Sequence, residues 1–115
     1  MIVEDQPDFL DILEFHLEAS GFLVAAVPDA EKAVELLGHF RPALVITDLM
    51  MPGPTGVDLI HYIRGTRDLT AVPVIVITAA DEGMIWQSRQ AGADSILCKP
   101  LDYELFLQTL GLYAA

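Results

Sequence analysis

Acidic, hydroxyl and basic side chains stand where the apolar runs of this sequence end. Glu4 and Asp5 follow the run that begins the chain, and Asp48 follows a later one. Two further runs end at Thr78 and Lys99. In an open parallel sheet, ligands bind beside the carboxyl ends of the strands, where the strand order reverses. We therefore expect carboxylates, a hydroxyl and an ammonium group to gather at one edge of a sheet.

Carboxylates crowded at one edge need a cation nearby. Like charges raise one another's pKa values, and a bound divalent ion is the usual way to keep several carboxylates ionised side by side. A few protein oxygens on a short rim, completed by water, match the coordination habits of Mg²⁺ better than those of Ca²⁺. We therefore predict a magnesium site at Glu4, Asp5 and Asp48.

The same residues could carry out phosphoryl transfer. A carboxylate such as that of Asp48 can act as a nucleophile and form an aspartyl phosphate. Lys99 would supply a positive charge, and Thr78 a hydroxyl donor, for the oxygens of the phosphoryl group. Because positioning and charge neutralisation carry most of this chemistry, the set is complete for transfer to an aspartate.

Five short apolar runs predict the strands that position these residues. The runs are continuously apolar rather than alternating, which is typical of parallel strands buried on both faces. About 10–15 residues separate consecutive runs, the length that a helical crossover needs. We predict an α/β fold, a three-layer α/β/α sandwich built on a five-stranded parallel sheet. The strands are expected at residues 1–3, 22–27, 43–46, 74–77 and 96–98.

Periodicity and end signals predict a helix after each strand. The first helix has an apolar arc, at about 100° per residue, and its members are Phe9, Ile12, Leu13, His16 and Leu17. Gly21 would end this helix as a left-handed cap residue. The other helices are expected to begin at Asp29, Gly56, Asp81 and Asp102 and to end near Gly38, Gly65, Gly92 and Leu112.

Composition excludes several classes of protein. A chain of 115 residues suits one domain, residues 1–115. With 17 acidic and 6 basic side chains its net charge is -11, which would repel nucleic acid. No apolar stretch approaches the ~20 residues of a membrane span and no signal peptide is readable, so we expect a cytoplasmic location. Cys98 is the single cysteine, which excludes an internal disulfide and favours a core position.

Four short segments resemble the receiver domains of bacterial response regulators in two-component signalling. The segments are VED after the first run, DLMMPGPTG after the third, VITA after the fourth and CKP after the fifth. Their order and spacing are nearly those of the family, and the resemblance covers the whole chain. It implies a flavodoxin-like fold with strand order 2-1-3-4-5.

The resemblance implies an acceptor and a metal site. Asp48 would accept a phosphoryl group from the phosphohistidine of a sensor histidine kinase, or from a small donor such as acetyl phosphate. Asp5 would bind Mg²⁺ directly, and Glu4 would bind it through water. The carbonyl oxygen of Met50 would supply a further ligand beside Asp48.

The resemblance also implies a response to phosphorylation. Thr78 would turn towards the phosphoryl group and Lys99 would pair with it, and the bond before Pro100 is often cis in the family, which helps to aim the lysine. The sequence departs from the family at Ile96, where an aromatic switch residue is usual. An isoleucine has no ring or hydroxyl to move between exposed and buried positions.

The partners implied by the resemblance are a sensor histidine kinase or a phosphotransfer protein. A second copy of the chain or an output domain would bind the surface of the fourth helix, fifth strand and fifth helix. We expect exposed apolar side chains at Phe15, Trp86 and Leu105 to serve such contacts. The domain would promote its own phosphorylation and dephosphorylation without being a turnover enzyme.

Three other functions stay open. A flavodoxin-like cofactor binder would hold a phosphate after the first strand, where the acidic segment EDQPD would repel it. A phosphohydrolase would carry an acid/base aspartate two residues after the nucleophile, where this chain has Met50. A degenerate receiver would act as a phosphorylation-independent interaction module, and Ile96 keeps this alternative open.

Overall fold

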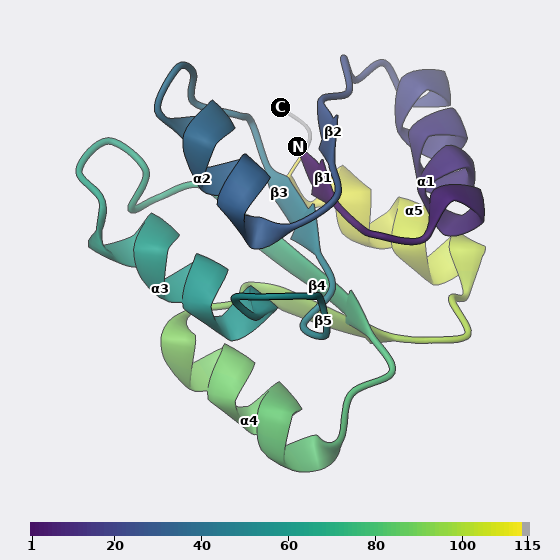
Figure 1. Cartoon of the computed structure of the whole chain (residues 1–115). Helices are drawn as coiled ribbons and strands as arrows, with labels where there is room; N and C mark the ends of the chain where they lie inside the picture. Colours follow the sequence, from purple (N-terminus) through teal and green to yellow (C-terminus); the bar gives the residue numbers. More distant parts are fainter. Residues whose placement is uncertain (114–115) are drawn as a thin grey trace.

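Strands and helices alternate along residues 1–113, which are the residues that the computed structural model describes (Figure 1). The strands are β1 (Ile2–Val3), β2 (Ala26–Val27), β3 (Val45–Thr47), β4 (Val74–Thr78) and β5 (Ser95–Cys98). The helices are α1 (Pro7–Ala19), α2 (Ala30–Leu37), α3 (Gly56–Gly65), α4 (Glu82–Ala91) and α5 (Tyr103–Gly111).

The five strands form one sheet in the order β2-β1-β3-β4-β5, and every pair is parallel. This confirms the predicted fold and strand order. Helices α1 and α5 cover one face of the sheet, and α2, α3 and α4 cover the other (Figure 1). The register places Val3 beside Thr47, so the segments that follow β1 and β3 leave the sheet side by side.

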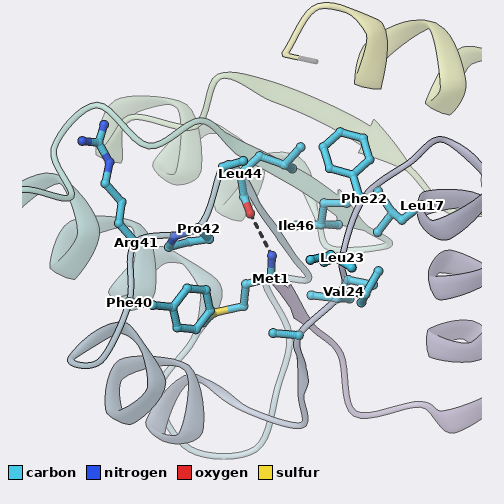
Figure 2. A pocket seen from close by; sticks show the side chains of 13 residues that line it. Met1, Leu17, Phe22, Leu23, Val24, Phe40, Arg41, Pro42, Leu44 and Ile46 are labelled. Carbon is cyan, nitrogen blue, oxygen red and sulfur yellow. Dashed lines mark hydrogen bonds between the residues drawn. The ribbon is translucent and has the colours of Figure 1, made fainter. Parts of the chain in front are cut away.

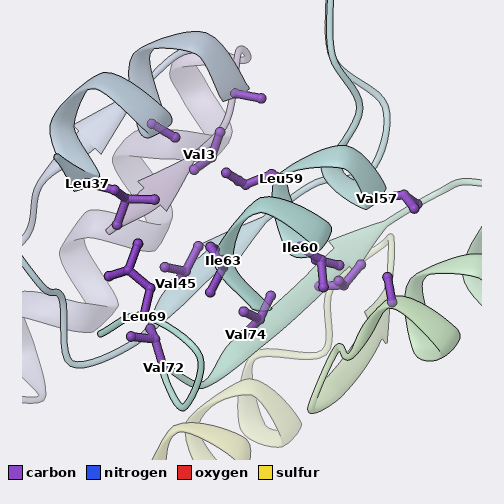
Figure 3. Packing of buried hydrophobic residues seen from close by; sticks show 14 of the residues in the cluster. Val3, Leu37, Val45, Val57, Leu59, Ile60, Ile63, Leu69, Val72 and Val74 are labelled. Carbon is purple, nitrogen blue, oxygen red and sulfur yellow. The ribbon is translucent and has the colours of Figure 1, made fainter. Parts of the chain in front are cut away.

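Alternate residues of each strand face opposite layers of helices, which explains why the runs are continuously apolar. In β4, Val74 and Val76 belong to the core under α2, α3 and α4, whereas Ile75 and Ile77 belong to the core under α1 and α5. Figure 3 shows the first of these cores, in which Ile63 of α3 lies among side chains from the sheet.

Side chains at the helix ends satisfy backbone groups as the sequence predicts. Asp29, Asp81 and Asp102 each accept a hydrogen bond from the amide three residues later, at 2.8, 2.9 and 3.1 Å. Helix α3 begins with a capping box between Thr55 and Asp58. The caps of α3, α4 and α5 start these helices directly after the segments that carry Asp48, Thr78 and Lys99.

One arginine holds the amino end of the sheet. Arg64, in the last turn of α3, donates to the carbonyl oxygens of Val72 (2.6 Å) and Gly92 (2.8 Å) and pairs with Asp94 (2.8 Å). Asp94 also accepts from the amide of Val74 (2.8 Å). The ends of α3 and α4 are thereby fixed to the starts of β4 and β5, opposite the predicted site.

The strand predicted at residues 22–27 is wrong in length, because only Ala26–Val27 pair in the sheet. Strand β1 offers β2 just two residues, and the carbonyl oxygen of Ala25 accepts from the amide of Ile2 (2.8 Å), so residues 22–24 lie beyond the paired part of β1. Next to them is a cavity of about 290 Å³ (Figure 2). Its lining includes the apolar side chains of Phe22, Val24, Phe40 and Leu44.

Two side chains predicted to be inside are exposed. Ile12 is 42% exposed, because the buried side of α1 centres on Leu13 and Leu17 and Ile12 lies at the edge of the apolar arc. Cys98, predicted to be a core residue, is also exposed. It is the last residue of β5, at the edge of the sheet, whereas its neighbour Leu97 belongs to the core under α1 and α5.

Replacing Gly56 by alanine should destabilise the fold. Gly56 is the buried first residue of α3, and an added Cβ would overlap the carbonyl oxygen of Asp48 and lie 2.8 Å from the Cα of Leu49. Both contacts are backbone atoms that cannot move aside cheaply. We expect the free energy of unfolding in urea to fall by about 1–3 kcal/mol.

Gly65, at the other end of the same helix, provides the matched control. An added Cβ there meets no atom within 4 Å. Gly65→Ala should leave stability unchanged or raise it by up to about 1 kcal/mol. Equal effects of the two substitutions would show that steric overlap at Gly56 is not the cause.

Candidate functional site

The predicted residues meet at the carboxyl edge of the sheet. Glu4 follows β1, Asp48 follows β3, and Thr78 and Lys99 end or follow β4 and β5. The amide of Lys99 donates to the carbonyl oxygen of Thr78 (2.9 Å), which extends the pairing of the two strands by one residue. The bond between Lys99 and Pro100 is cis, the form that the resemblance described above makes common at this position.

The ammonium group of Lys99 joins two carboxylates from different strands. Its Nζ lies 2.9 Å from Oδ2 of Asp48 and 3.5 Å from Oε2 of Glu4. The Glu4 side chain is only 2% exposed and that of Asp48 is 9% exposed. At this burial a carboxylate is stable in its charged form only when a partner compensates for the lost water. Lys99 is that partner for both acids.

The carboxylate of Asp48 is held at both oxygens. Oδ1 accepts from the backbone amides of Leu49 (2.6 Å) and Met50 (3.2 Å), while Oδ2 accepts from Lys99. The carbonyl oxygen of Asp48 accepts from the hydroxyl of Thr47 (2.7 Å). The loop after β3 therefore fixes both the backbone and the side chain of Asp48.

Glu4 is the more buried of the two acids. Burial raises the pKa of Glu4 above its ordinary value, and the hydrogen bond from the amide of Gln6 (3.1 Å) and the charge of Lys99 only partly oppose this shift. For Lys99, burial favours the neutral amine. The hydrogen bond and charge of Asp48, with the charge of Glu4, outweigh burial and raise the pKa of Lys99. The lysine is therefore a fixed positive charge at neutral pH.

Thr78 lies at the site with its hydroxyl directed elsewhere. It is fully buried, and its Oγ1 accepts from the amide of Ala80 (3.1 Å). The hydroxyl forms no hydrogen bond with Asp48 or Lys99. The structure thus brings Thr78 to the predicted edge without joining it to the ion pairs.

Asp5 and Met50 lie on the outer rim. Asp5 is exposed and forms no hydrogen bond or ion pair with any side chain or backbone group of residues 1–113. Met50 is also exposed, and its carbonyl oxygen accepts no hydrogen bond within the same range. Both offer oxygen atoms that are unengaged within these residues.

The expected gathering of three carboxylates is not formed. Among residues 1–113, no three acidic, histidine or cysteine side chains lie close enough to hold a metal ion together. Glu4 turns inward to Lys99 and the amide of Gln6, whereas Asp5 is exposed. The chain bends at Asp5, directly after β1, so the two neighbouring side chains lie in different surroundings.

The ammonium group of Lys99 has a third neighbour, besides Asp48 and Glu4, which sequence reasoning missed. Its Nζ is 4.7 Å from the centre of the Phe9 ring, in the first turn of α1. The sequence placed Phe9 on the apolar arc of this helix, and no signal in the sequence pointed to an ammonium group beside it.

Comparison with known proteins identifies the family. The family model of the response regulator receiver domain matches residues 1–110. The chain belongs to this family. A receiver domain of a two-component system fits the phosphotransfer role of the family and is not a canonical turnover enzyme.

Known receivers resemble it over most of its length. It is 32% identical to PilH of Pseudomonas aeruginosa, covering 100% of this chain and 96% of that protein. It is 31% identical to the DNA-binding response regulator MtrA of Mycolicibacterium smegmatis, covering 87% of this chain but only 43% of MtrA. The receiver domain of a P. aeruginosa sensor histidine kinase, solved with magnesium in its active-site cleft, superposes with a TM-score of 0.88 at 28% identity, covering 97% of this chain and 93% of that one.

Replacing Lys99 by methionine should destabilise this receiver domain. Lys99→Met keeps an unbranched side chain but leaves the buried carboxylates of Asp48 and Glu4 without their cation. We expect the free energy of unfolding at pH 7, measured in urea without added metal, to fall by about 1–3 kcal/mol. Adding Glu4→Gln to this variant should recover part of the loss, because one of the two uncompensated charges is removed.

Lys32 provides the control for this experiment. It pairs with Glu35 (3.5 Å) on the exposed side of α2. Lys32→Met should therefore change the free energy of unfolding by about 0.5 kcal/mol or less. Equal losses in the Lys99 and Lys32 variants would contradict a stabilising role for the site lysine.

Glu4 should make stability depend on pH in the acidic range. Since burial raises its pKa above the ordinary 4.5, the folded chain binds the Glu4 proton more tightly than the unfolded chain does. Its contribution to the free energy of unfolding therefore falls as pH rises through the folded pKa. In metal-free urea denaturation, the wild type should lose stability relative to Glu4→Gln from pH about 4 to pH 7. The difference in free energy of unfolding between the wild type and Glu4→Gln should therefore change with pH. A constant difference, or a change no larger than that measured for Glu18→Gln at an exposed position, would disprove the role of Glu4.

Proposed function

We propose that Asp48 is the phosphoacceptor of this receiver domain. The observation that carries the proposal is the carboxylate itself, which two backbone amides and the ammonium of Lys99 orient at the carboxyl edge of the sheet. In the reaction, a carboxylate oxygen of Asp48 attacks the phosphorus atom of the donor and forms a new O–P bond. The bond from phosphorus to the histidine nitrogen or acetate oxygen breaks, and its electron pair leaves with that group.

Lys99 and Thr78 are proposed to bind the transferred group. Phosphorylation changes the Asp48 carboxylate into an acyl phosphate, so the ammonium of Lys99 loses part of its partner's charge and can pair with phosphoryl oxygens. Thr78 would donate its hydroxyl proton to the same group after turning from the amide of Ala80. These roles follow the family's pattern, and the position of both residues at this edge supports them.

The oxygen atoms of the rim fit the Mg²⁺ ion that we propose as cofactor. Asp5, Asp48 and the carbonyl of Met50 would hold it directly, with Glu4 acting through water. All are hard oxygen donors, and the oxygens of Asp5 and Met50 are unengaged within residues 1–113. When bound, the ion would neutralise charge on the phosphoryl oxygens. The magnesium in the P. aeruginosa kinase receiver supports this assignment.

The proposed partners are a sensor histidine kinase or phosphotransfer protein, and a second copy or output domain. Exposed apolar side chains are present where the sequence predicts them, with Phe15 on α1, Trp86 on α4 and Leu105 on α5 exposed by 68, 62 and 46%. We propose that α1 contributes to kinase docking and that the surface of α4, β5 and α5 binds the output partner.

We propose that residues 1–115 act as one receiver domain, of which residues 114 and 115 lie outside the described part. We also propose that it promotes its own phosphorylation and dephosphorylation. No helix within residues 1–113 is long and apolar enough to cross a membrane. A cytoplasmic location and the absence of direct binding to nucleic acid remain part of this proposal.

A degenerate receiver that binds partners without phosphorylation is the second candidate. Ile96 favours it, because this side chain is half-buried against the core with Ala80 and Met84 and has no ring to expose. Phosphorylation would then be absent, or would occur without a structural response.

The deciding experiment is phosphorylation by acetyl phosphate with Mg²⁺, followed by intact mass. The wild type should gain the mass of one phosphoryl group, and Asp48→Asn should gain none. Asp11→Asn, an exposed aspartate on α1, should behave as the wild type. Amide NMR spectra with a beryllofluoride mimic should shift in the wild type. An adduct that persists in Asp48→Asn would sink the proposed acceptor, and no adduct and no spectral response would favour the degenerate receiver.

A further inference from the structure

Phe9 brings an aromatic face to the ammonium group at the centre of the site. It lies in the first turn of α1, which begins at Pro7 soon after the acidic pair that follows β1. Its ring centre is 4.7 Å from Nζ of Lys99, and the side chain is half-buried against the core shared by α1 and α5. This core holds the ring in place.

The distance and burial are those of a cation–π contact. The face of an aromatic ring is negative, and it attracts an ammonium group within about 6 Å of the ring centre, more strongly where water is partly excluded. The Lys99 side chain is 24% exposed. Its ammonium therefore has Asp48 at 2.9 Å, Glu4 at 3.5 Å and the Phe9 ring as its neighbours.

We infer that Phe9 is a positioning residue, which holds the ammonium of Lys99 between Asp48 and Glu4. A lysine stem is flexible and its ammonium is strongly hydrated, so two carboxylates of unequal distance do not alone fix its position. The ring attracts the charge without accepting a strong hydrogen bond. The N–H groups of Lys99 are thus left to oxygen atoms.

This property matters when the charge on Asp48 changes. A third carboxylate in place of Phe9 would compete with a phosphoryl group for the N–H donors of Lys99. The ring keeps the ammonium in place and leaves those donors available. This consequence for phosphoryl transfer rests on the proposed function of Asp48, whereas the position of Lys99 does not.

The inference predicts that a ring at position 9 can be exchanged only for another ring. Phe9→Leu keeps an apolar side chain, and Phe9→Tyr keeps the aromatic face. Phosphorylation by acetyl phosphate should slow by roughly two- to thirtyfold in Phe9→Leu and stay within about twofold of the wild type in Phe9→Tyr. Phe22→Leu serves as control, because Phe22 packs half-buried on the same core but precedes β2 at the opposite end of the sheet.

Two further measurements separate positioning from packing. In NMR spectra the ε-methylene protons of Lys99 should be shifted upfield by the ring in the wild type and in Phe9→Tyr, but not in Phe9→Leu. In a Lys99→Met background, Phe9→Leu should have no additional effect on the rate. A wild-type Lys99 signal without a ring shift, or equal slowing by the leucine and tyrosine variants, would overturn the inference.

The outcomes also distinguish this inference from the proposed function. If the ring shift is present but Asp48 is not phosphorylated, the phosphoacceptor proposal fails and the positioning of Lys99 stands. If Asp48 is phosphorylated at the wild-type rate in Phe9→Leu, the proposed function stands and the inference fails.

Discussion

The structure of the site depends on one ammonium group that compensates for two buried carboxylates. Asp48 and Glu4 come from neighbouring strands and lie almost out of contact with water, where two like charges would repel each other. Lys99 reaches them from β5, which is two strands away from β3. The sheet order, the long lysine stem and the aromatic face of Phe9 together allow one ammonium group to compensate for the charges of both carboxylates.

The scaffold serves this interaction by keeping the strand ends in register. Both faces of the sheet are buried, so a slip by one residue would exchange the side chains between the two cores. Aspartate caps start α2, α4 and α5, and Arg64 fixes the opposite edge. Arg64 holds the amino end of the sheet, and the carboxyl end carries the polar side chains of the site.

Sequence reasoning succeeded where local chemistry decides the outcome. The helix caps at Asp29 and Asp102 and the meeting of Asp48 with Lys99 were predictable from the residues, whereas the strand order came from the family resemblance. It failed where the outcome depends on a neighbour. Residues 22–24 lack strand pairing because β1 does not extend beside them, and Cys98 is exposed because it is the last residue of the edge strand β5.

The sequence by itself determined which residues reach the carboxyl edge of the sheet, because chain order and apolar runs specify where each strand ends. Only the tertiary structure decided how these residues share their contacts. The Glu4 side chain points inward to Lys99, whereas Asp5 is exposed on the rim. Phe9, which the sequence placed on the apolar arc of α1, faces the ammonium group of Lys99. The physical reason is that burial and partner choice are properties of surfaces brought together from distant parts of the chain, and periodicity along the chain does not contain them.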